Sequence, residues 1–177
     1  MTNEELIKSI RIVPDFPIEG IQFFDVTTLF KNPAAFGEVL DRICELYRDK
    51  GITKVAGIES RGFIAGAAAA ARLGAGFVPV RKPGKLPAEA VSESYSKEYG
   101  TDTIEVHADA IGPDDVVLIH DDIYATGGTA AAAIRLVQQF KPKAVYANFI
   151  INITDVPRSE SIPEGVPVSF LLNLSEK

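Results

Sequence analysis

The sequence predicts one α/β domain over residues 1–177, in which helices cover both faces of a parallel sheet. Two observations carry this prediction. Short apolar runs typical of buried strands alternate with longer runs of helical periodicity, and the chain has the length of a single domain. In a sheet of this kind, ligands gather at the carboxyl ends of the strands.

The N-terminal part of the chain predicts two helices. Thr2 followed by Glu5 is a capping-box pattern and predicts a short first helix. Asn32 followed by Pro33 predicts the start of a second helix, and Gly51 is expected to end it. The apolar residues of the second helix fall on one face, which we expect to be buried: Phe36, Val39, Leu40, Ile43, Leu46 and Tyr47.

A β-α-β unit is expected next. Residues 54–58 predict a buried strand, residues 62–73 a helix closed by Gly74, and residues 77–80 a second strand. The following stretch, 81–102, is polar, rich in Gly, Pro, Ser and Lys, and longer than a structural connection needs. We therefore expect a long mobile loop there.

The C-terminal part of the chain continues the alternation. Short strands are predicted at residues 103–106 and 116–120, and a helix at residues 129–140, where Lys-Pro follows. The last two strands are predicted at residues 144–151 and 168–172.

Composition limits the classes of function. Apolar residues make up 46% of the chain, no apolar run approaches the roughly 18 residues of a membrane span, and the first ten residues do not form a secretory signal. We therefore expect a cytoplasmic protein that binds no membrane. A formal net charge of -6 argues against nucleic acid as a ligand. The single cysteine, Cys44, falls among apolar helical positions, as a buried structural thiol does.

The stretch VVLIHDDIYATGGTAAAAIRLVQQF, residues 116–140, contains a loop suited to an anion. Gly127 and Gly128 let backbone amides at a helix N-terminus approach a phosphate, and Thr126 and Thr129 add hydroxyl donors. Neither a Walker lysine nor a GxGxxG pattern is present. The loop therefore suits one terminal monophosphate.

Two adjacent carboxylates, Asp121 and Asp122, precede this loop. They would repel the phosphate itself, but they could accept hydrogen bonds from a vicinal diol or face a metal elsewhere on the same ligand. Ribose 5-phosphate has this layout, so we predict a ribose-phosphate pocket. The alternative is a pair of solvated acids beside a glycine-rich turn.

The segment GIESRGF, residues 57–63, predicts a second anion site. A strand ends there, and Gly62 opens a helix with Arg61 beside its free amides, where a guanidinium suits phosphate oxygens. The alternative is a surface salt bridge between Arg61 and Glu59. Two anion sites at neighbouring strand ends favour a ligand with phosphate at both ends.

Four segments in this order resemble the adenine branch of the type I phosphoribosyltransferases. They are IVPDFPIEGIQFFD (12–25), ESRGF (59–63), RKPGKLP to SYSKEYG (81–100) and VVLIHDDIYATGGT (116–129). The resemblance covers residues 11 to about 150. It implies a parallel sheet flanked by helices, with a small N-terminal hood and a long mobile loop.

The activity that the resemblance implies is purine salvage. Adenine and 5-phosphoribosyl 1-diphosphate would give AMP and diphosphate, with Mg²⁺ held mainly by substrate and water instead of by protein ligands. No cluster of His and Cys indicates zinc. The transition state would resemble an oxocarbenium ion, so positioning and charge stabilisation would supply most of the rate.

The resemblance also assigns residues to this activity. The ribose 5-phosphate site would comprise Asp121, Asp122, Ala125, Thr126, Gly127, Gly128 and Thr129. The diphosphate site would comprise Glu59, Ser60, Arg61, Arg81 and Lys85, with a cis peptide expected at Glu59–Ser60. The catalytic residues would be Glu98, Arg61, Lys85 and Tyr99.

Within that catalytic set, the family assigns Glu98 to proton transfer at the purine and Tyr99 to the shape of the closed site. Arg81, Lys82 and Lys85 suit a closing lid, because cations there would neutralise the leaving group and exclude water. The alternative for all five is an ordinary solvated surface.

The apolar segment PDFPIEGIQFF suits recognition of a flat base. Phe23 is expected to stack the base, and by resemblance backbone groups near Ile21 and Phe24 would read the edge of adenine. Enzymes of this type for 6-oxopurines carry an aspartate where Ala125 stands, which favours adenine. The alternative for this segment is a hood that packs on the main domain.

Some positions depart from the family pattern. Phe24 stands where many relatives have a basic residue, His120 where an aliphatic residue is usual, and Tyr124 where a small or aliphatic residue is usual. We expect His120 to be a partnered strand-end residue. The tail after residue 150 lacks the usual Glu and Gly-Arg pattern.

The resemblance further implies a homodimer in which Arg81 reaches the diphosphate of the neighbouring subunit. Two other functions remain open from the sequence. One is a phosphoribosyltransferase for another nucleobase. The other is a regulator that senses the sugar diphosphate and binds nucleic acid, for which this acidic chain has no basic segment.

Overall fold

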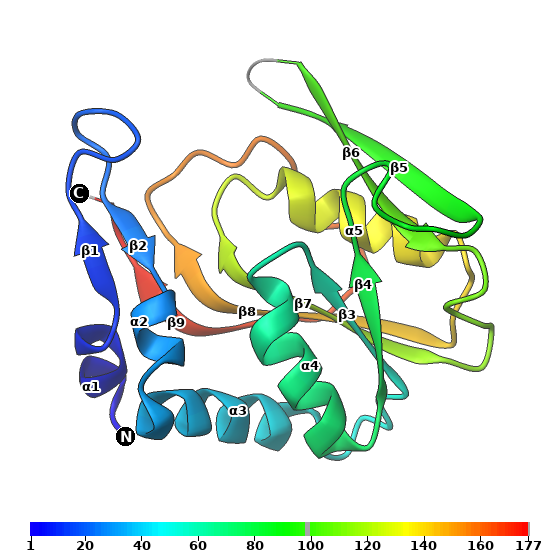
Figure 1. Ribbon diagram of the computed structural model, residues 1–177, viewed down its shortest axis with the longest axis horizontal. Coiled ribbons are helices and arrows are strands. Elements are labelled where there is room, and N and C mark those ends of the chain that lie inside the picture. The colour runs from blue at the N-terminus through cyan, green and yellow to red at the C-terminus, as the bar shows by residue number, and fades with distance from the viewer. Residues whose placement is uncertain (98–99, 177) are drawn as a thin grey trace.

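A five-stranded parallel sheet forms the centre of the protein (Figure 1). The computed structural model describes residues 1–97 and 100–176. The order of the strands across the sheet is β4-β3-β7-β8-β9, and every neighbouring pair is parallel. Their bounds are Lys54–Ile58 (β3), Gly76–Val80 (β4), Val116–Tyr124 (β7), Ala144–Ile153 (β8) and Val168–Leu174 (β9).

Both faces of the sheet are covered, which is why its central strands read as nearly continuous apolar runs. Helices α3 (Pro33–Tyr47) and α4 (Gly62–Leu73) pack with Val55, Leu118 and Ile150 in one core cluster. Helix α5 (Gly128–Gln138) packs in a second cluster with residues of the other face, among them Val117 and Ile119. The α/β architecture predicted from the sequence is confirmed.

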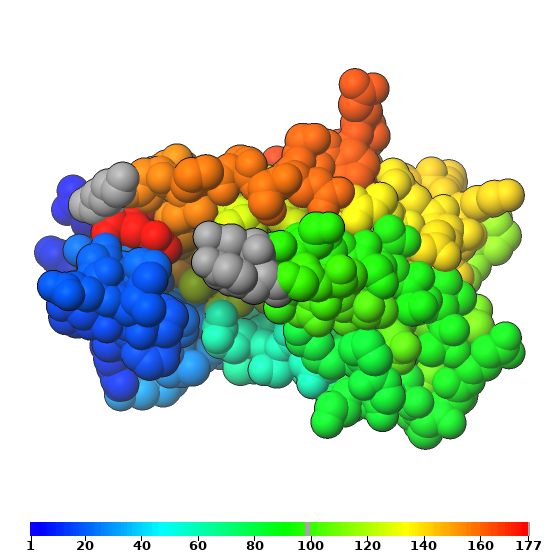
Figure 2. Space-filling model, turned by 90° about the horizontal axis from the view of Figure 1, so that it is seen from above, coloured from blue at the N-terminus to red at the C-terminus, as the bar shows by residue number. Residues whose placement is uncertain are grey.

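A small N-terminal hood lies beside β9, as the two views show together (Figures 1 and 2). It consists of α1 (Asn3–Lys8), β1 (Arg11–Val13), β2 (Phe23–Asp25) and α2 (Thr27–Phe30), and its two strands pair antiparallel. The hood was expected, but these two strands and α2 were not predicted, because each is only three or four residues long.

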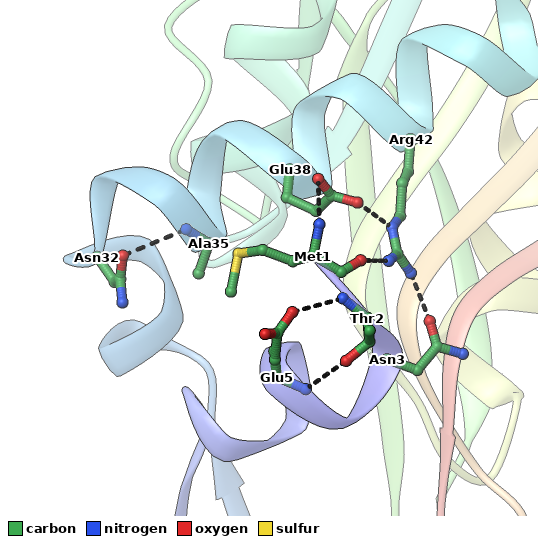
Figure 3. A network of polar contacts seen from close by, with 8 residues as sticks. All are labelled: Met1, Thr2, Asn3, Glu5, Asn32, Ala35, Glu38 and Arg42. Atoms are coloured by element: carbon green, nitrogen blue, oxygen red, sulfur yellow. Dashed lines mark hydrogen bonds and ion pairs between the residues drawn. The ribbon is translucent and has the colours of Figure 1, made fainter.

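Polar contacts tie the start of the chain to α3 (Figure 3). The amino group of Met1 lies 3.1 Å from Glu38, and Arg42 donates hydrogen bonds to the backbone oxygen of Met1 and to Asn3. The capping box predicted for α1 is formed, and Asn32 caps α3 through the amides of Ala34 and Ala35.

Residues 81–102 do not form one irregular loop, so this part of the prediction was wrong. Strand β5 (Ala90–Ser96) pairs antiparallel with β6 (Thr101–His107), and the two make a ribbon beside α5 (Figure 1). Strand β5 was not predicted from the sequence, because serine and glutamate alternate there with few apolar residues. Pairing with β6 and burial of Tyr95 stabilise the strand instead.

Several bounds also differ from the prediction. Strand β7 continues four residues beyond His120, so that Asp121 and Asp122 lie inside the strand.

Leu46 was expected on the buried face of α3, but 45% of it is exposed. Cys44 is half-buried, and burial raises the pKa of its thiol. Within the described residues, we find no helix with the length and apolar character of a membrane span.

Candidate active site

The predicted site residues gather where β3 and β7 end. Gly62, the first residue of α4, lies directly against β7. A Cβ atom on Gly62 would stand 2.7 Å from the backbone oxygen of His120 and 3.0 Å from Oδ1 of Asp121. Only glycine therefore lets α4 start this close to the acid pair, and this approach sets the position of the neighbouring Arg61.

Arg61 contacts the acid pair directly. Its Nε donates a hydrogen bond to Asp122, whose side chain is 3% exposed, whereas the side chain of Arg61 is 43% exposed. The guanidinium also lies 5.8 Å from the centre of the Phe23 ring. Arg61 therefore connects the carboxylate expected to hold the ribose with the ring expected to hold the base. The alternative pair of Arg61 with Glu59 is not formed.

The two acids differ in accessibility. Asp122 is buried under Arg61, whereas Asp121 lines two separate hollows. Oδ1 of Asp121 accepts the backbone N–H of Asp122 at 2.9 Å. Burial, followed by the charge of Asp122, raises the pKa of Asp121 well above its ordinary value. The pair therefore presents less negative charge than two solvated carboxylates would to the loop predicted to bind phosphate, residues 125–129 (the phosphate loop).

The phosphate loop begins at the end of β7. Gly127 has a φ of 91° and precedes α5, and no side chain in the described part of the chain caps the amides of this helix. A hollow of about 110 Å³ lies inside the loop, and amides at a helix N-terminus suit an anion there. The residues that line it include Asp121, Ala125, Thr126, Gly127 and Thr129. Gly128 instead faces the ribbon, close to Tyr95.

The turn after β3 forms the predicted diphosphate segment. The expected cis peptide at Glu59–Ser60 is present. The backbone N–H of Lys82 donates to Glu59 at 2.7 Å, and this bond does most to lower the pKa of that carboxyl. Glu59 also accepts hydrogen bonds from Arg81 of the same chain at 3.3 and 3.4 Å. Ser60 is exposed.

The ribbon closes a second hollow, of about 210 Å³, over this turn. One oxygen of Asp102 lies 2.5 Å from Nζ of Lys82 and 2.6 Å from Nζ of Lys97, and these two bonds hold the pKa of Asp102 well below its ordinary value. The hydroxyl of Tyr95 donates to the same oxygen and accepts from Thr129. The ribbon is thereby linked to the phosphate loop.

Three further residues of the stretch 81–102 were predicted to belong to the site. Lys85 is exposed, and its backbone oxygen accepts a hydrogen bond from Arg81 at 3.3 Å. Glu98 and Tyr99 lie outside the described residues. Figure 2 shows one face of the molecule, with the hood in blue on one side and the ribbon in green on the other.

In the hood, neighbouring aromatic residues point in opposite directions. Phe24 is buried in the core, whereas Phe23 is half-buried and meets Phe16 edge to face at 5.2 Å. Phe24 can therefore contribute to base recognition only through its backbone. Ile21 is half-buried, and its backbone oxygen already accepts the N–H of Phe16.

Two departures from the family pattern have structural explanations. His120 is fully buried and bonds Asn148 at 3.1 Å, and burial lowers the pKa of His120 to about 4. Tyr124 packs against Phe149 and Phe170, each at 5.2 Å, under the guanidinium of Arg158. His120 thus has a partner, as expected, although it lies inside the strand.

Sequence reasoning missed several residues of this site. Tyr95 and Lys97 lie in the SYSKEYG segment that carried the resemblance, so their position in a matched motif was an available signal. Asp102 and Arg158 had no local signal, because an isolated charged residue in a polar stretch is typical of any surface.

The geometry can be compared with known proteins. A family model described as a phosphoribosyl transferase domain matches residues 25–164. A curated adenine phosphoribosyltransferase of Phocaeicola vulgatus is 60% identical over 174 residues, which are 98% of this chain and 100% of that protein. The chain belongs to the adenine phosphoribosyltransferase family. This result confirms the family predicted from the sequence, and with it the class of pentosyltransferase.

Solved structures of adenine phosphoribosyltransferases have the same fold. The crystal structure from Rhodothermus marinus has a TM-score of 0.90 and 51% identity, and the match covers 97% of this chain and 98% of that one. The Saccharomyces cerevisiae structure, a complex with adenine and an imino-altritol bisphosphate, has a TM-score of 0.83 and 38% identity, with coverage of 96% and 97%.

Proposed function

We propose that this chain transfers the phosphoribosyl group of 5-phosphoribosyl 1-diphosphate to adenine and forms AMP and diphosphate in purine salvage. The observation that carries the proposal is the position of Asp121, which lines both the hollow of the phosphate loop and the hollow under the ribbon. A pentose with phosphate groups at both ends fits such an arrangement. Relatives that bear this activity in their names support it.

The proposed reaction breaks the bond between C1′ and the diphosphate oxygen and forms a bond between C1′ and N9 of adenine. The amides of residues 126–129 hold the 5′-phosphate, and Asp121 and Asp122 accept the ribose hydroxyls. Glu59, Ser60, Arg61, Arg81 and Lys85 face the diphosphate. Because charge develops on the leaving group and on the sugar, preorganised donors and acceptors provide most of the rate.

The base loses its N9 proton in this reaction. We propose that Glu98 transfers it and that Tyr99 completes the closed site; both lie outside the described residues. Phe23 stacks the adenine ring, and backbone groups near Ile21 and Phe24 read its edge. Glu98→Gln is expected to lower kcat much more than it changes KM for either substrate.

Magnesium is the proposed cofactor. Among the described residues, no three His, Cys, Asp or Glu side chains come together as a metal site. The acids that line the hollow under the ribbon are Glu59, Asp102 and Asp121, and Asp102 binds both lysines of the same hollow, Lys82 and Lys97. These donors fit Mg²⁺ that is held mainly by diphosphate oxygens and water, its preferred ligands. When bound, the ion would neutralise the departing diphosphate.

Two further proposals concern the assembly and its location. We propose a cytoplasmic homodimer in which Arg81 reaches the diphosphate of the neighbouring subunit. In the single chain Arg81 binds Glu59, so that the reach across the interface requires an exchange of partners. Light scattering measures the mass in solution, and mixing Arg81→Ala with Asp122→Asn chains tests whether subunits complement one another.

The experiment for the function is an assay of diphosphate release with a panel of bases. Adenine with Mg²⁺ is expected to support turnover, whereas hypoxanthine, guanine, xanthine and orotate are not. Turnover with another base instead of adenine would favour a different phosphoribosyltransferase. Binding of the sugar diphosphate without any turnover would favour the regulator.

A further inference from the structure

The chain that follows β8 returns across the outside of the phosphate loop. The backbone N–H of Ser159 donates to the carbonyl oxygen of Thr126 at 2.9 Å. The guanidinium of Arg158 donates to the carbonyl oxygen of Ala125. Two consecutive carbonyl groups of the loop are therefore bound by two consecutive residues of a segment that lies more than thirty positions further along the chain.

These contacts fix the direction of the amides in the loop. In a trans peptide, the C=O and the following N–H point to opposite sides of the bond. The cis peptides in the described chain are at Phe16–Pro17 and Glu59–Ser60, so the peptides after Ala125 and Thr126 are trans. Binding their carbonyl groups from outside therefore turns the N–H groups of Thr126 and Gly127 the other way. Both residues line the hollow of the phosphate loop.

Arg158 is itself held from several sides. Its Nη2 donates to Oδ1 of Asn152 at 2.7 Å and to the backbone oxygen of Ile153 at 2.8 Å. Its guanidinium carbon lies 4.5 Å from the centre of the Tyr124 ring. A planar fork with five donors suits several carbonyl groups and an aromatic face, which a lysine ammonium cannot match. This arrangement gives a use to Tyr124, which departs from the family pattern.

The returning segment and the loop are in close contact. A Cβ atom on Gly127 would lie 2.6 Å from the backbone oxygen of Glu160 and 2.9 Å from the hydroxyl of Tyr124. The Glu160 side chain pairs with Arg135 of α5, so that the segment is also held against the helix that the loop precedes. A loop with two glycines has much conformational freedom, and these contacts restrict it.

We propose that Arg158 and Ser159 are positioning residues of the phosphate site, which orient the amides of Thr126 and Gly127 by holding the carbonyl groups of Ala125 and Thr126. In this proposal they act through the backbone of the loop, to which they donate their hydrogen bonds. The inference rests on the proposed function only in that the loop binds a phosphate. It assigns a role to a tail segment that lies outside the four segments on which the resemblance rests.

The first experiment compares two substitutions at Ser159. Ser159→Pro removes the N–H donor, whereas Ser159→Ala keeps this donor and removes only the hydroxyl, which lies 3.3 Å from the same oxygen. Calorimetry with ribose 5-phosphate is expected to give a dissociation constant about tenfold higher for Ser159→Pro and unchanged for Ser159→Ala.

The second experiment uses Arg158→Lys, with Arg48→Lys as control, since Arg48 binds Glu45 on the exposed side of α3. KM for the sugar diphosphate is expected to rise about tenfold, with KM for adenine unchanged. Equal increases in both constants would show a general structural role and overturn the proposal. So would wild-type binding of ribose 5-phosphate by both Arg158→Lys and Ser159→Pro.

If the proposed function is wrong, the wild-type chain itself binds no ribose 5-phosphate. This result differs from every outcome described above, in which only the variants change. A thermal melt of each variant identifies loss of fold, and because Arg158→Lys and Ser159→Pro act through different donors, either one that folds tests the proposal.

Discussion

Arg61 and Asp122 form an ion pair that joins the start of α4 to the end of β7, and the guanidinium of Arg61 also faces the ring of Phe23. One cation therefore stands between the acid expected to bind the ribose and the ring expected to bind the base. A ribose hydroxyl that approaches Asp122 must share this carboxylate with Arg61. Changes at either residue should thus affect substrate binding as well as stability.

Asp122→Asn is expected to raise KM for the sugar diphosphate at least tenfold, because the amide loses the charge that accepts the ribose hydroxyl. The fold should persist, with a loss of about 1–3 kcal/mol in the free energy of unfolding, since Arg61 is half exposed and keeps part of its hydration. Saturation kinetics and urea unfolding measure the two effects.

The control for this change is Asp41→Asn, which breaks the exposed pair of Asp41 with Arg72. This pair should contribute about 0–1 kcal/mol, and its loss should leave the kinetics unchanged. If Asp122→Asn saturates like the wild type, the assignment of Asp122 to the ribose is wrong.

Gly62→Ala is expected to abolish most of the activity, because the added Cβ would stand 2.7 Å from the backbone of β7 and press on Asp121. The matched control is Gly37→Ala in α3, where the added atom meets nothing within 4 Å. Alanine there should stabilise the helix by about 0.5–1 kcal/mol and leave turnover intact. Equal activity of the two variants would contradict the close packing at Gly62.

His120→Leu is expected to reduce the dependence of stability on pH. Burial lowers the pKa of His120 to about 4, so the unfolded chain binds a proton below pH 6.5 while the folded chain does not. The stabilisation is complete above pH 6.5 and falls by about 3 kcal/mol as the pH drops to 4. Urea unfolding at pH 7.5 and pH 4.5 measures the difference between wild type and variant.

The wild type and the variant must be compared with each other, because Asp121 changes the stability with pH in the opposite direction: its pKa is raised in the fold. Phe149→Leu is the control, since it alters a buried side chain of β8 without changing an ionisable group. It should lower the stability by the same amount at both pH values. An unaltered pH dependence in His120→Leu would mean that His120 takes up its proton in the folded chain.

Phe23→Leu is expected to raise KM for adenine severalfold and to leave KM for the sugar diphosphate unchanged, because aromatic stacking contributes about 0.5–1.5 kcal/mol. Phe16→Leu is the matched control, since Phe16 is exposed and its ring meets that of Phe23 edge to face. Steady-state kinetics with each substrate varied in turn give both constants. Identical effects of the two substitutions would argue against stacking on Phe23.

The sequence predicted those parts of the protein that depend on local pattern. The β-α-β unit and the phosphate loop were found because apolar periodicity, glycines and helix caps are read from neighbouring residues. The ribbon strand β5 was missed, because its stability comes from pairing with β6. The partner of Arg61 was not predictable for a related reason: the choice between Glu59 and Asp122 is made by the tertiary approach of Gly62 to β7.

One oxygen of Asp102 binds the ammonium groups of both Lys82 and Lys97, so that the three side chains together carry one net positive charge instead of two. We therefore expect the ribbon to attract anions in bulk solution less strongly than two unpaired lysines would, and discrimination to occur on contact, when a polyphosphate exchanges partners with the lysines. A chain of net charge -6 can in this way bind a strongly anionic metabolite without a positively charged surface that would also bind RNA.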